Sequence, residues 1–410
     1  MYPRETLVTV AQEGARIRSV ARSLSDVMSV LDRPTIESTP DGPSIESLRS
    51  DFFGIADDTA DDSSEDLRSF AKSIPDVARG VVIVACSDTA VHAARAAVAL
   101  IPDPSVPIAV VDRLPRYVGA MDCVIVLTPD PADREAEEAV VRCRQVGAMV
   151  MVAAPTSGPV AEAGSGYGLV VPDIPGAVEE SWGRYVATVT GGCGLVGQLP
   201  IQGVLDYAAD AVDREMEASG PERDESVNPA RQLGLRMKDH RVVIAGDGAT
   251  RHVASFAARR LLQHGIVAAT ADTAELARFY SYLHRGTSMD TAIDSSSETM
   301  TRLGSGAISD VDKSIFYDPF LDAPAVQPLA AVVVPGPGGY SGRGRNDEPD
   351  TGVSRAYPSE QELSRLERYF DARPVTVVDL TASDLHSAVA YICVLAARCA
   401  AAAAYVVAQE

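Results

Sequence analysis

Two copies of one strand–turn–helix–strand pattern occupy the chain, and this duplication constrains the fold more than any other feature. Each copy has an apolar run, a small polar turn, a helical stretch and a second apolar run. The first copy comprises residues 80–86, 87–89, 92–100 and 107–111, and the second comprises 241–245, 246–250, 252–262 and 266–270. Asp112 and Asp272 end the second runs and stand about 160 residues apart, close to one domain length. The repeat predicts two similar domains with ligand chemistry at their strand-to-helix turns.

Both halves continue in the same order, with a strand, a helix, a strand and a long apolar helix. The first half has these at 123–127, 133–146, 149–153 and 180–196, and the second has them at 331–334, 360–370, 375–379 and 386–407. Short apolar runs that alternate with helical patterns are typical of buried parallel strands with helices on both faces. Handedness rules favour a doubly wound sheet in each half. We therefore expect an α/β fold of two doubly wound, flavodoxin-like parallel-sheet domains with an N-terminal helical segment.

The regions outside the repeats set the expected domain boundaries. Residues 5–31 have helical periodicity, and the stretch 32–69 is rich in Asp, Ser, Pro and Thr, which is typical of a solvated acidic loop. Between the repeats, a helix over 205–216 and a polar linker over 217–227 are expected. The predicted units are residues 1–75 (helix and acidic loop), 76–200 (first domain), 201–230 (helix and linker) and 231–410 (second domain).

Charge and composition narrow the classes of partner. The formal net charge of −21 argues against a nucleic-acid partner, which needs a basic surface. The first residues are mixed polar and do not resemble a signal peptide, so a cytoplasmic location is expected. The apolar run 388–407 contains Arg398 and mostly alanines, and a buried helix between domains or subunits is a better interpretation than a membrane span. No membrane partner is expected.

Cysteine and histidine patterns give no sign of a metal site. The six cysteines include no CxxC pair, which favours reduced, buried thiols. The six histidines are scattered, without the i, i+4 spacing that places two ligands on one helix face. We expect neither a metal nor a cofactor.

Two glycine-bearing segments invite a phosphate interpretation. The stretch 335–357 lacks the Walker spacing and is interpreted as a flexible surface insertion, although Arg343 and Arg345 leave open a fold over an anion. In the turn 246–251, Gly246 and Gly248 would let backbone N–H groups approach a phosphate at a helix N-terminus. A tight turn without a ligand is an equal alternative.

Several short motifs, taken with the order of the elements, resemble the sugar isomerase (SIS) superfamily. Within it the chain looks like the bifunctional phosphoglucose/phosphomannose isomerase branch. The motifs are 118–126 (VGAMDCVIV), 150–155 (VMVAAP), 182–185 (WGRY), 315–320 (IFYDPF) and 401–407 (AAAAYVV). The resemblance covers the chain from about residue 79 onward. It implies two domains that hold a phosphosugar at strand ends, a glutamate that moves a proton between C1 and C2, and a histidine that helps to open the ring.

Carried onto this sequence, the resemblance names one set of candidate residues. The implied catalytic pair is Glu275 as base and His284 as ring-opening group. The implied phosphate- and sugar-binding residues are Ser87, Thr89, Thr128, Arg184, Gly246 and Gly248. This chain departs from the family pattern at several points. Asp88, Asp130 and Asp133 add negative charge beside the hydroxyls, and the last helix carries His386 and Arg398 but no lysine. Ser87 and Thr89 also fit ordinary helix capping, which is compatible with phosphate binding.

Three functions follow from these observations. The first is an isomerase that interconverts glucose, mannose and fructose 6-phosphates through an enediolate. The second is a non-catalytic or regulatory phosphosugar-binding protein. The third is an NAD(P)-dependent oxidoreductase that uses Gly246, Gly248 and Asp272. The expected partner is a small phosphosugar ligand, and the resemblance implies a homodimer, although two such domains in one chain also allow a monomeric pseudo-dimer.

Overall fold

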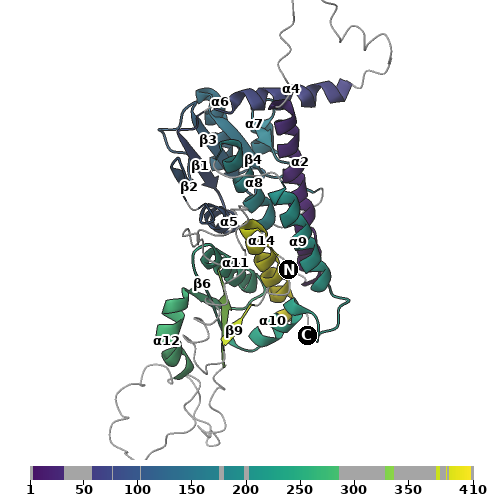
Figure 1. Ribbon diagram of the computed structural model, residues 1–410, viewed down its shortest axis with the longest axis vertical. Coiled ribbons are helices and arrows are strands. Elements are labelled where there is room, and N and C mark those ends of the chain that lie inside the picture. Colours follow the sequence, from purple (N-terminus) through teal and green to yellow (C-terminus); the bar gives the residue numbers. More distant parts are fainter. Residues whose placement is uncertain are drawn as a thin grey trace, which may run out of the picture.

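Two parallel sheets, one in each half of the chain, are joined by a group of helices into an elongated molecule (Figure 1). The computed structural model describes residues 3–31, 58–75, 77–101, 103–174, 180–197, 203–285, 328–336, 375–378, 385 and 387–407. The predicted helix over 360–370, the motif over 315–320, most of the Gly/Arg segment 335–357 and His386 therefore lie outside the described residues.

The first sheet has five parallel strands in the order β2-β1-β3-β4-β5. Every residue of β3 and β4 is buried, as the continuous apolar runs predict for strands covered on both faces. The strands are β1 (Gly80–Ala85), β2 (Ile108–Val111), β3 (Asp122–Leu127), β4 (Met149–Ala153) and β5 (Leu169–Val170). The strand β5 is too short to give an alternation signal, and the sequence did not predict it.

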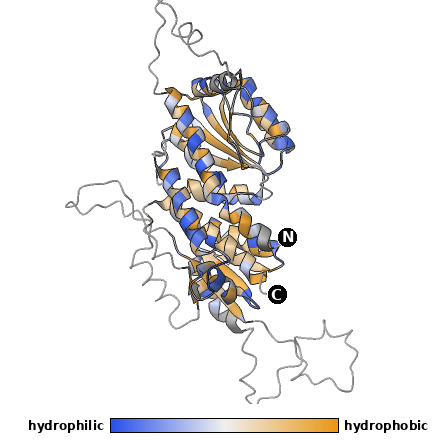
Figure 2. Cartoon of the chain, turned by 90° about the vertical axis from the view of Figure 1, so that its right-hand side faces the viewer, coloured by the Kyte–Doolittle hydropathy of each residue, from blue (hydrophilic) through white to orange (hydrophobic). Residues whose placement is uncertain are grey.

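Alternate residues of the first sheet pack against different helices. On one face Ile83 and Ile125 share a core with α5 and α8, and on the other Val82 and Val124 share a core with α6 and α7. The helices are α5 (Asp88–Val98), α6 (Arg134–Val146), α7 (Pro159–Gly164) and α8 (Trp182–Leu195). This two-sided covering confirms the doubly wound arrangement. Figure 2 shows the apolar strands of the larger sheet enclosed by helices with polar outer faces.

The second half repeats this plan with a four-stranded parallel sheet in the order β7-β6-β8-β9. Ile244 and Val332 pack toward α11 and α14, while Val243 and Val333 pack toward α12. The elements are β6 (Arg241–Gly246), α11 (Ala249–Gln263), β7 (Ala268–Ala271), α12 (Thr273–Arg285), β8 (Leu329–Val334), β9 (Val375–Val377) and α14 (Ala388–Val407). The order of its four strands matches that of β2-β1-β3-β4, so the structure confirms the duplicated α/β unit.

The halves meet through α5 and α11, and α14 runs through the centre of the molecule (Figure 1). The helix α14 is long and apolar enough to cross a membrane, and among the described helices it alone passes that test. Its apolar window is completely buried in the core. It packs against α9 (Val204–Ala218), α10 (Pro229–Met237) and α11. The structure thus agrees with the prediction of a buried helix between domains.

The N-terminal helices belong to the core. The helix α1 (Pro3–Ala11) packs on α14, and α2 (Glu13–Leu31) packs on α8 and α9. The prediction that 32–69 is a loop is wrong for its last part, because Asp58–Ser73 forms the helix α4. Phe70 and Ala71 of α4 are buried, and α4 packs against α2. Burial of this apolar face stabilises a helix, although the acidic composition of the segment is typical of a loop.

Candidate functional site

The strand order of the first sheet locates the place where a ligand is expected. In the order 2-1-3-4-5 the direction of winding changes between β1 and β3, and ligands of such sheets bind outside the carboxyl ends of these strands. Cys86 and Ser87 follow β1, and Thr128 follows β3. We call this expected position, at the carboxyl ends of β1 and β3, the β1/β3 crevice below, and Cys86, Ser87 and Thr128 are the side chains that follow the two strands.

Ser87 is the polar residue best placed in the β1/β3 crevice. It is half-buried and forms the N-cap of α5, where its hydroxyl oxygen accepts a hydrogen bond from the Ala90 N–H at 3.0 Å. The same hydroxyl donates to Oε2 of Glu180 at 2.8 Å. Ser87 therefore uses both its acceptor and its donor, and it joins the start of α5 to the segment that leads into α8.

The second half of the chain reaches this same point through α11. Arg259 forms an ion pair with Asp88 in the first turn of α5. Arg260 Nη2 donates to the carbonyl oxygen of Glu180 at 2.9 Å, and its guanidinium lies 5.1 Å from the ring centroid of Phe256. The β1/β3 crevice is therefore bordered by both halves of the molecule. The first half contributes the strands, and the second half contributes Arg259 and Arg260 of α11.

The two predicted threonines have internal positions. Thr128 is fully buried, and its hydroxyl donates to Oδ2 of Asp133 at 3.2 Å and accepts from the Asp130 N–H at 3.2 Å. Asp133 also caps α6 by accepting from the Ala136 N–H. Thr89 is buried in the first turn of α5. Of the three predicted hydroxyls, Ser87 alone is half-exposed, and ligand binding by Thr89 and Thr128 stays a prediction.

Arg184 lies in the first turn of α8 and is only 2% exposed. Its Nη2 donates to the carbonyl oxygens of Ala154 at 2.7 Å and Val171 at 2.6 Å, and its Nη1 pairs with Oδ2 of Asp173 at 3.1 Å. Burial lowers its pKa from the usual range of arginine, opposed by Asp173. These contacts tie the loops after β4 and β5 to α8, and its predicted role in sugar binding stays a prediction.

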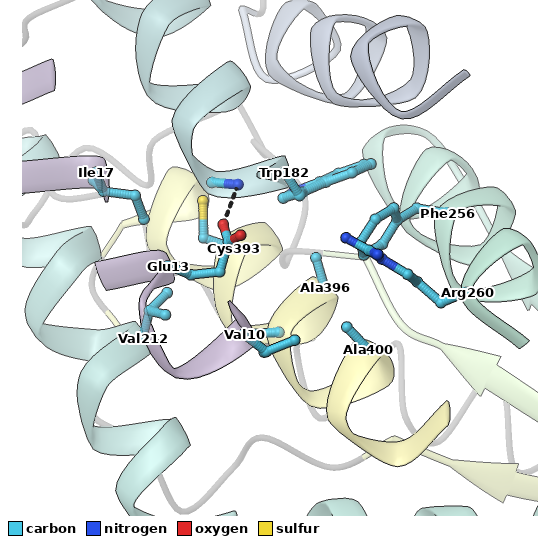
Figure 3. A pocket seen from close by; sticks show the side chains of 12 residues that line it. Val10, Glu13, Ile17, Trp182, Val212, Phe256, Arg260, Cys393, Ala396 and Ala400 are labelled. Atoms are coloured by element: carbon cyan, nitrogen blue, oxygen red, sulfur yellow. Dashed lines mark hydrogen bonds between the residues drawn. The ribbon is translucent and has the colours of Figure 1, made fainter. Parts of the chain in front are cut away.

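A buried carboxylate, Glu13 at the start of α2, holds the N-terminus of α8 (Figure 3). Its Oε2 accepts from the Ser181 hydroxyl at 2.8 Å and from the Gly183 N–H at 2.7 Å. Burial raises the pKa of Glu13, and the nearby Arg16 opposes that rise. The helical periodicity of 5–31 was visible in the sequence, but nothing local indicated that Glu13 would contact a helix more than 160 residues away.

Figure 3 also shows a small cavity where α2, α8, α11 and α14 meet. Trp182 and Phe256 face each other there, with ring centroids 4.7 Å apart. Its volume of about 10 Å³ is close to that of one water probe. A cavity of this size is too small for a sugar, so this junction is a packing feature between the halves.

Gly246, Gly248 and Glu275 lie at the carboxyl ends of the strands of the second sheet, and the end of α12, where His284 lies, is beside the amino end of β6. A Cβ on Gly246 would lie 2.6 Å from the carbonyl oxygen of Thr250, so the close approach of β6 and α11 explains this glycine. Gly248 has φ +54°, which favours glycine. Glu275 is exposed in the first turn of α12, where its N–H donates to Oδ1 of Asp272. His284 is in the last turn of α12, and its side chain lies outside the described ones.

The structure therefore divides the predicted site residues between two sheet edges. Ser87, Thr89 and Thr128 lie at the first sheet, while Gly246, Gly248 and Glu275 lie at the second. Sequence reasoning missed two side chains at the β1/β3 crevice, Glu180 and Arg260. Neither could be found from local sequence, because their contacts join distant residues. The Ser87–Glu180 bond spans 93 positions and the Arg260–Glu180 bond spans 80.

The cysteines and the possible metal ligands among the described residues do not indicate a catalytic thiol or a metal site. All six cysteines are free thiols, and burial, with Asp133 nearby, raises the pKa of Cys86 to about 12. Cys86 therefore stays protonated at neutral pH and is a poor nucleophile. Within the described ranges no group of three or more His, Cys, Asp or Glu side chains could hold a metal ion.

Comparison with known proteins gives a likeness in structure alone. No protein-family model matches the chain, and no curated protein is significantly similar in sequence. The crystal structure of tagatose-6-phosphate ketose/aldose isomerase from Escherichia coli superposes with a TM-score of 0.52 at 13% identity, over 99% of this chain and 92% of that chain. The C-terminal domain of glucosamine-fructose-6-phosphate aminotransferase from Francisella tularensis has a TM-score of 0.50 at 11% identity, over 98% and 95%. At these identities the likeness establishes the fold alone, a two-domain α/β arrangement shared with these two proteins.

Proposed function

We propose that the chain binds a hexose 6-phosphate at the β1/β3 crevice and interconverts its aldose and ketose forms. Glucose, mannose and fructose 6-phosphates are the proposed substrates, as in the bifunctional phosphoglucose/phosphomannose isomerases that the sequence resembles. The observation that carries the proposal is the position of Ser87, a half-exposed hydroxyl at the N-terminus of α5 and at the winding switch of the first sheet.

The N-terminus of α5 suits the phosphate group. The first N–H groups of a helix have no intrahelical acceptor, and the helix dipole favours an anion beside them. Asp88 in this first turn would repel a phosphate, but Arg259 pairs with it and offsets its charge.

A second function, non-catalytic phosphosugar binding, has one observation in its favour. Thr128 is engaged internally by Asp130 and Asp133, so the loop after β3 uses its hydroxyl to hold its own conformation. A protein of this kind would bind the sugar phosphate at the N-terminus of α5 without turnover.

The test combines binding with turnover. Thermal stabilisation of the full chain is measured with glucose, mannose and fructose 6-phosphates, with NAD and NADP as further probes. A ligand at about a hundred times its Kd adds roughly 2.7 kcal/mol to the free energy of unfolding. Isomerisation is followed by NMR.

Ser87→Ala should weaken binding of the sugar phosphate about tenfold, because it removes the hydroxyl that caps α5 beside the proposed phosphate position. Ser29→Ala, which removes an exposed hydroxyl of α2 that donates to the carbonyl oxygen of Asp26, is the matched control. Stabilisation by a sugar phosphate without turnover would favour the non-catalytic function. Stabilisation by a dinucleotide alone would favour the oxidoreductase, and it would refute the proposal.

A further inference from the structure

We propose that the carboxylate of Glu180 competes with the phosphate of the ligand for the N-terminus of α5, so that binding requires this side chain to turn away. The inference rests on the proposed function, because it concerns access to the same β1/β3 crevice. It starts from the hydrogen bond of 2.8 Å that the Ser87 hydroxyl donates to Oε2 of Glu180. Glu180 is thereby a residue that sets the affinity of the site for anions.

The Ser87 hydroxyl is the group for which the competition is direct. A serine hydroxyl has one hydrogen to donate. Here that hydrogen goes to Glu180, while the oxygen accepts from the Ala90 N–H at 3.0 Å. A phosphate oxygen that accepts from Ser87 therefore replaces Oε2 of Glu180. The chain itself supplies an anion beside a helix N-terminus, which is the position where the helix dipole favours one.

The charges around this position distinguish Glu180 from the other nearby carboxylate. Asp88 lies in the first turn of α5, but Arg259 pairs with it and offsets its charge. The carboxylate of Glu180 contacts a neutral hydroxyl instead. A phosphate beside Ser87 would therefore be repelled more by Glu180 than by Asp88. Of these two carboxylates, Glu180 is the one whose removal should improve the binding of an anion.

Glu180 can leave this position without a movement of the main chain. Its carbonyl oxygen accepts from Nη2 of Arg260 at 2.9 Å, and the next residue, Ser181, caps α8 by accepting from the Arg184 N–H at 3.0 Å. These contacts hold the backbone at and after Glu180, whereas its side chain is half-exposed. Rotation about the side-chain bonds alone brings the carboxylate into solvent, and the cost is one hydrogen bond to Ser87.

The contact also gives the site a preference among ligands. A phosphate monoester carries up to two negative charges and three acceptor oxygens, so it offers more to the N-terminus of α5 than the single carboxylate that it displaces. A sugar without a phosphate has no charge with which to displace Glu180. We therefore expect the Glu180 contact to weaken the binding of phosphate-bearing ligands, while binding of the neutral sugar is unaffected.

The experiment compares Glu180→Gln with the wild type in the full-length chain, and it measures binding of glucose 6-phosphate, inorganic phosphate and glucose by calorimetry. Glutamine keeps an oxygen that can accept from Ser87 and removes the negative charge. The affinity for both phosphates should rise about tenfold, and the affinity for glucose should not change. High salt should narrow the difference, because it screens the repulsion. Glu162→Gln, at an exposed carboxylate of α7, changes the net charge equally and is the matched control.

The same substitution should change stability in the opposite direction. A negative charge near a helix N-terminus is stabilising, so Glu180→Gln should lower the melting temperature of the protein without added ligand by about one or two degrees. A lower melting temperature with unchanged or weaker phosphate binding would overturn the inference, because Glu180 would then support α5 or contribute to the binding of the ligand.

The remaining outcomes separate this inference from the proposed function. Tighter binding of both phosphates in Glu180→Gln, with Glu162→Gln unchanged, supports the inference, and so does binding of glucose 6-phosphate by Glu180→Gln alone. Equal tightening in the two variants overturns it, because the effect would then belong to net charge. Equal Kd values for wild type and Glu180→Gln overturn it and leave the proposed function standing. If neither protein binds the sugar phosphate, the proposed function itself is refuted.

Discussion

His92 and His252 face each other across the boundary between the two halves, with their Nδ1 atoms 3.5 Å apart. They lie on α5 and α11, the helices that follow the first strand of each repeat, and are 160 positions apart in the chain. Corresponding helices therefore meet at nearly corresponding residues, as they would in a symmetric dimer. The duplication seen in the sequence has become an internal pseudo-dimer.

This contact makes the boundary sensitive to acid. Burial is the main cause that lowers the pKa of His252 to about 4, and it also lowers the pKa of His92. Arg95 contributes to both shifts, Arg251 adds to that of His252 and Arg259 to that of His92, while Asp88 opposes the latter. Both rings are therefore neutral in the folded protein at neutral pH.

Stability should consequently fall as the pH drops from 6.5 toward 4, because the unfolded chain binds protons that the folded chain resists. Above that window the contribution is complete. We expect a loss of about 1 kcal/mol, because these half-exposed rings are partly screened by solvent. Urea unfolding across this pH range should show a weaker pH dependence for His92→Gln/His252→Gln. His240→Gln is the control, and an unchanged slope in the double variant would contradict the explanation.

Arg398 should be essential to the packing of α14. Its Nε and Nη2 donate to both carboxylate oxygens of Glu215 on α9, at 2.7 and 2.6 Å. The side chains are 12% and 6% exposed. Arg398→Ala leaves the carboxylate of Glu215 buried without this partner and should cost about 3–5 kcal/mol. Denaturant unfolding measures this cost. The double variant Arg398→Met/Glu215→Leu should recover much of it, and a neutral Arg398→Ala would contradict the prediction.

Gly192 allows α8 to lie close to the first sheet. A Cβ there would meet Cδ1 of Ile125 at 2.5 Å and Sδ of Met151 at 3.2 Å. Gly192→Ala should destabilise the protein by about 1–2 kcal/mol, because the strain outweighs the helix propensity that alanine adds. Gly119 has open space around it, so Gly119→Ala is the control in the same thermal-unfolding series. Equal melting temperatures for the two variants would contradict the prediction, because Ile125 and Met151 would then move aside for the added methyl group at no cost in stability.

Glu13 should connect the N-terminal helices to the rest of the fold. Glu13→Ala removes the acceptor of the Ser181 hydroxyl and the Gly183 N–H and takes a negative charge from beside Arg16. We expect a loss of about 3 kcal/mol, measured by urea unfolding. The matched control is Glu162→Ala, which removes an exposed carboxylate of α7 outside this network. A loss no larger than that of the control would contradict the role of Glu13.

Most of the strands could be predicted because each is a continuous apolar run. The pattern GVVIVAC predicted β1, and RVVIA predicted β6, since strands buried on both faces leave little room for polar residues. The helix α10 was missed although Asn228 and a proline begin it, because its nine residues give a short periodic pattern. The helix α4 was hidden by the acidic residues around its apolar face.

The sequence by itself determined that the chain is duplicated, that each copy is an α/β unit and that the last helix is buried. These properties can be read locally, because each helix or strand carries its own pattern of apolar and polar residues. The tertiary structure alone decided which side chains meet. Ser87 and Glu180 became neighbours, and Arg260 joined them from the other half, because the packing of α5 against α8 and α11 brings distant segments together. A site built from such contacts has no signature in local sequence, and so the sequence predicted the serine and missed the glutamate.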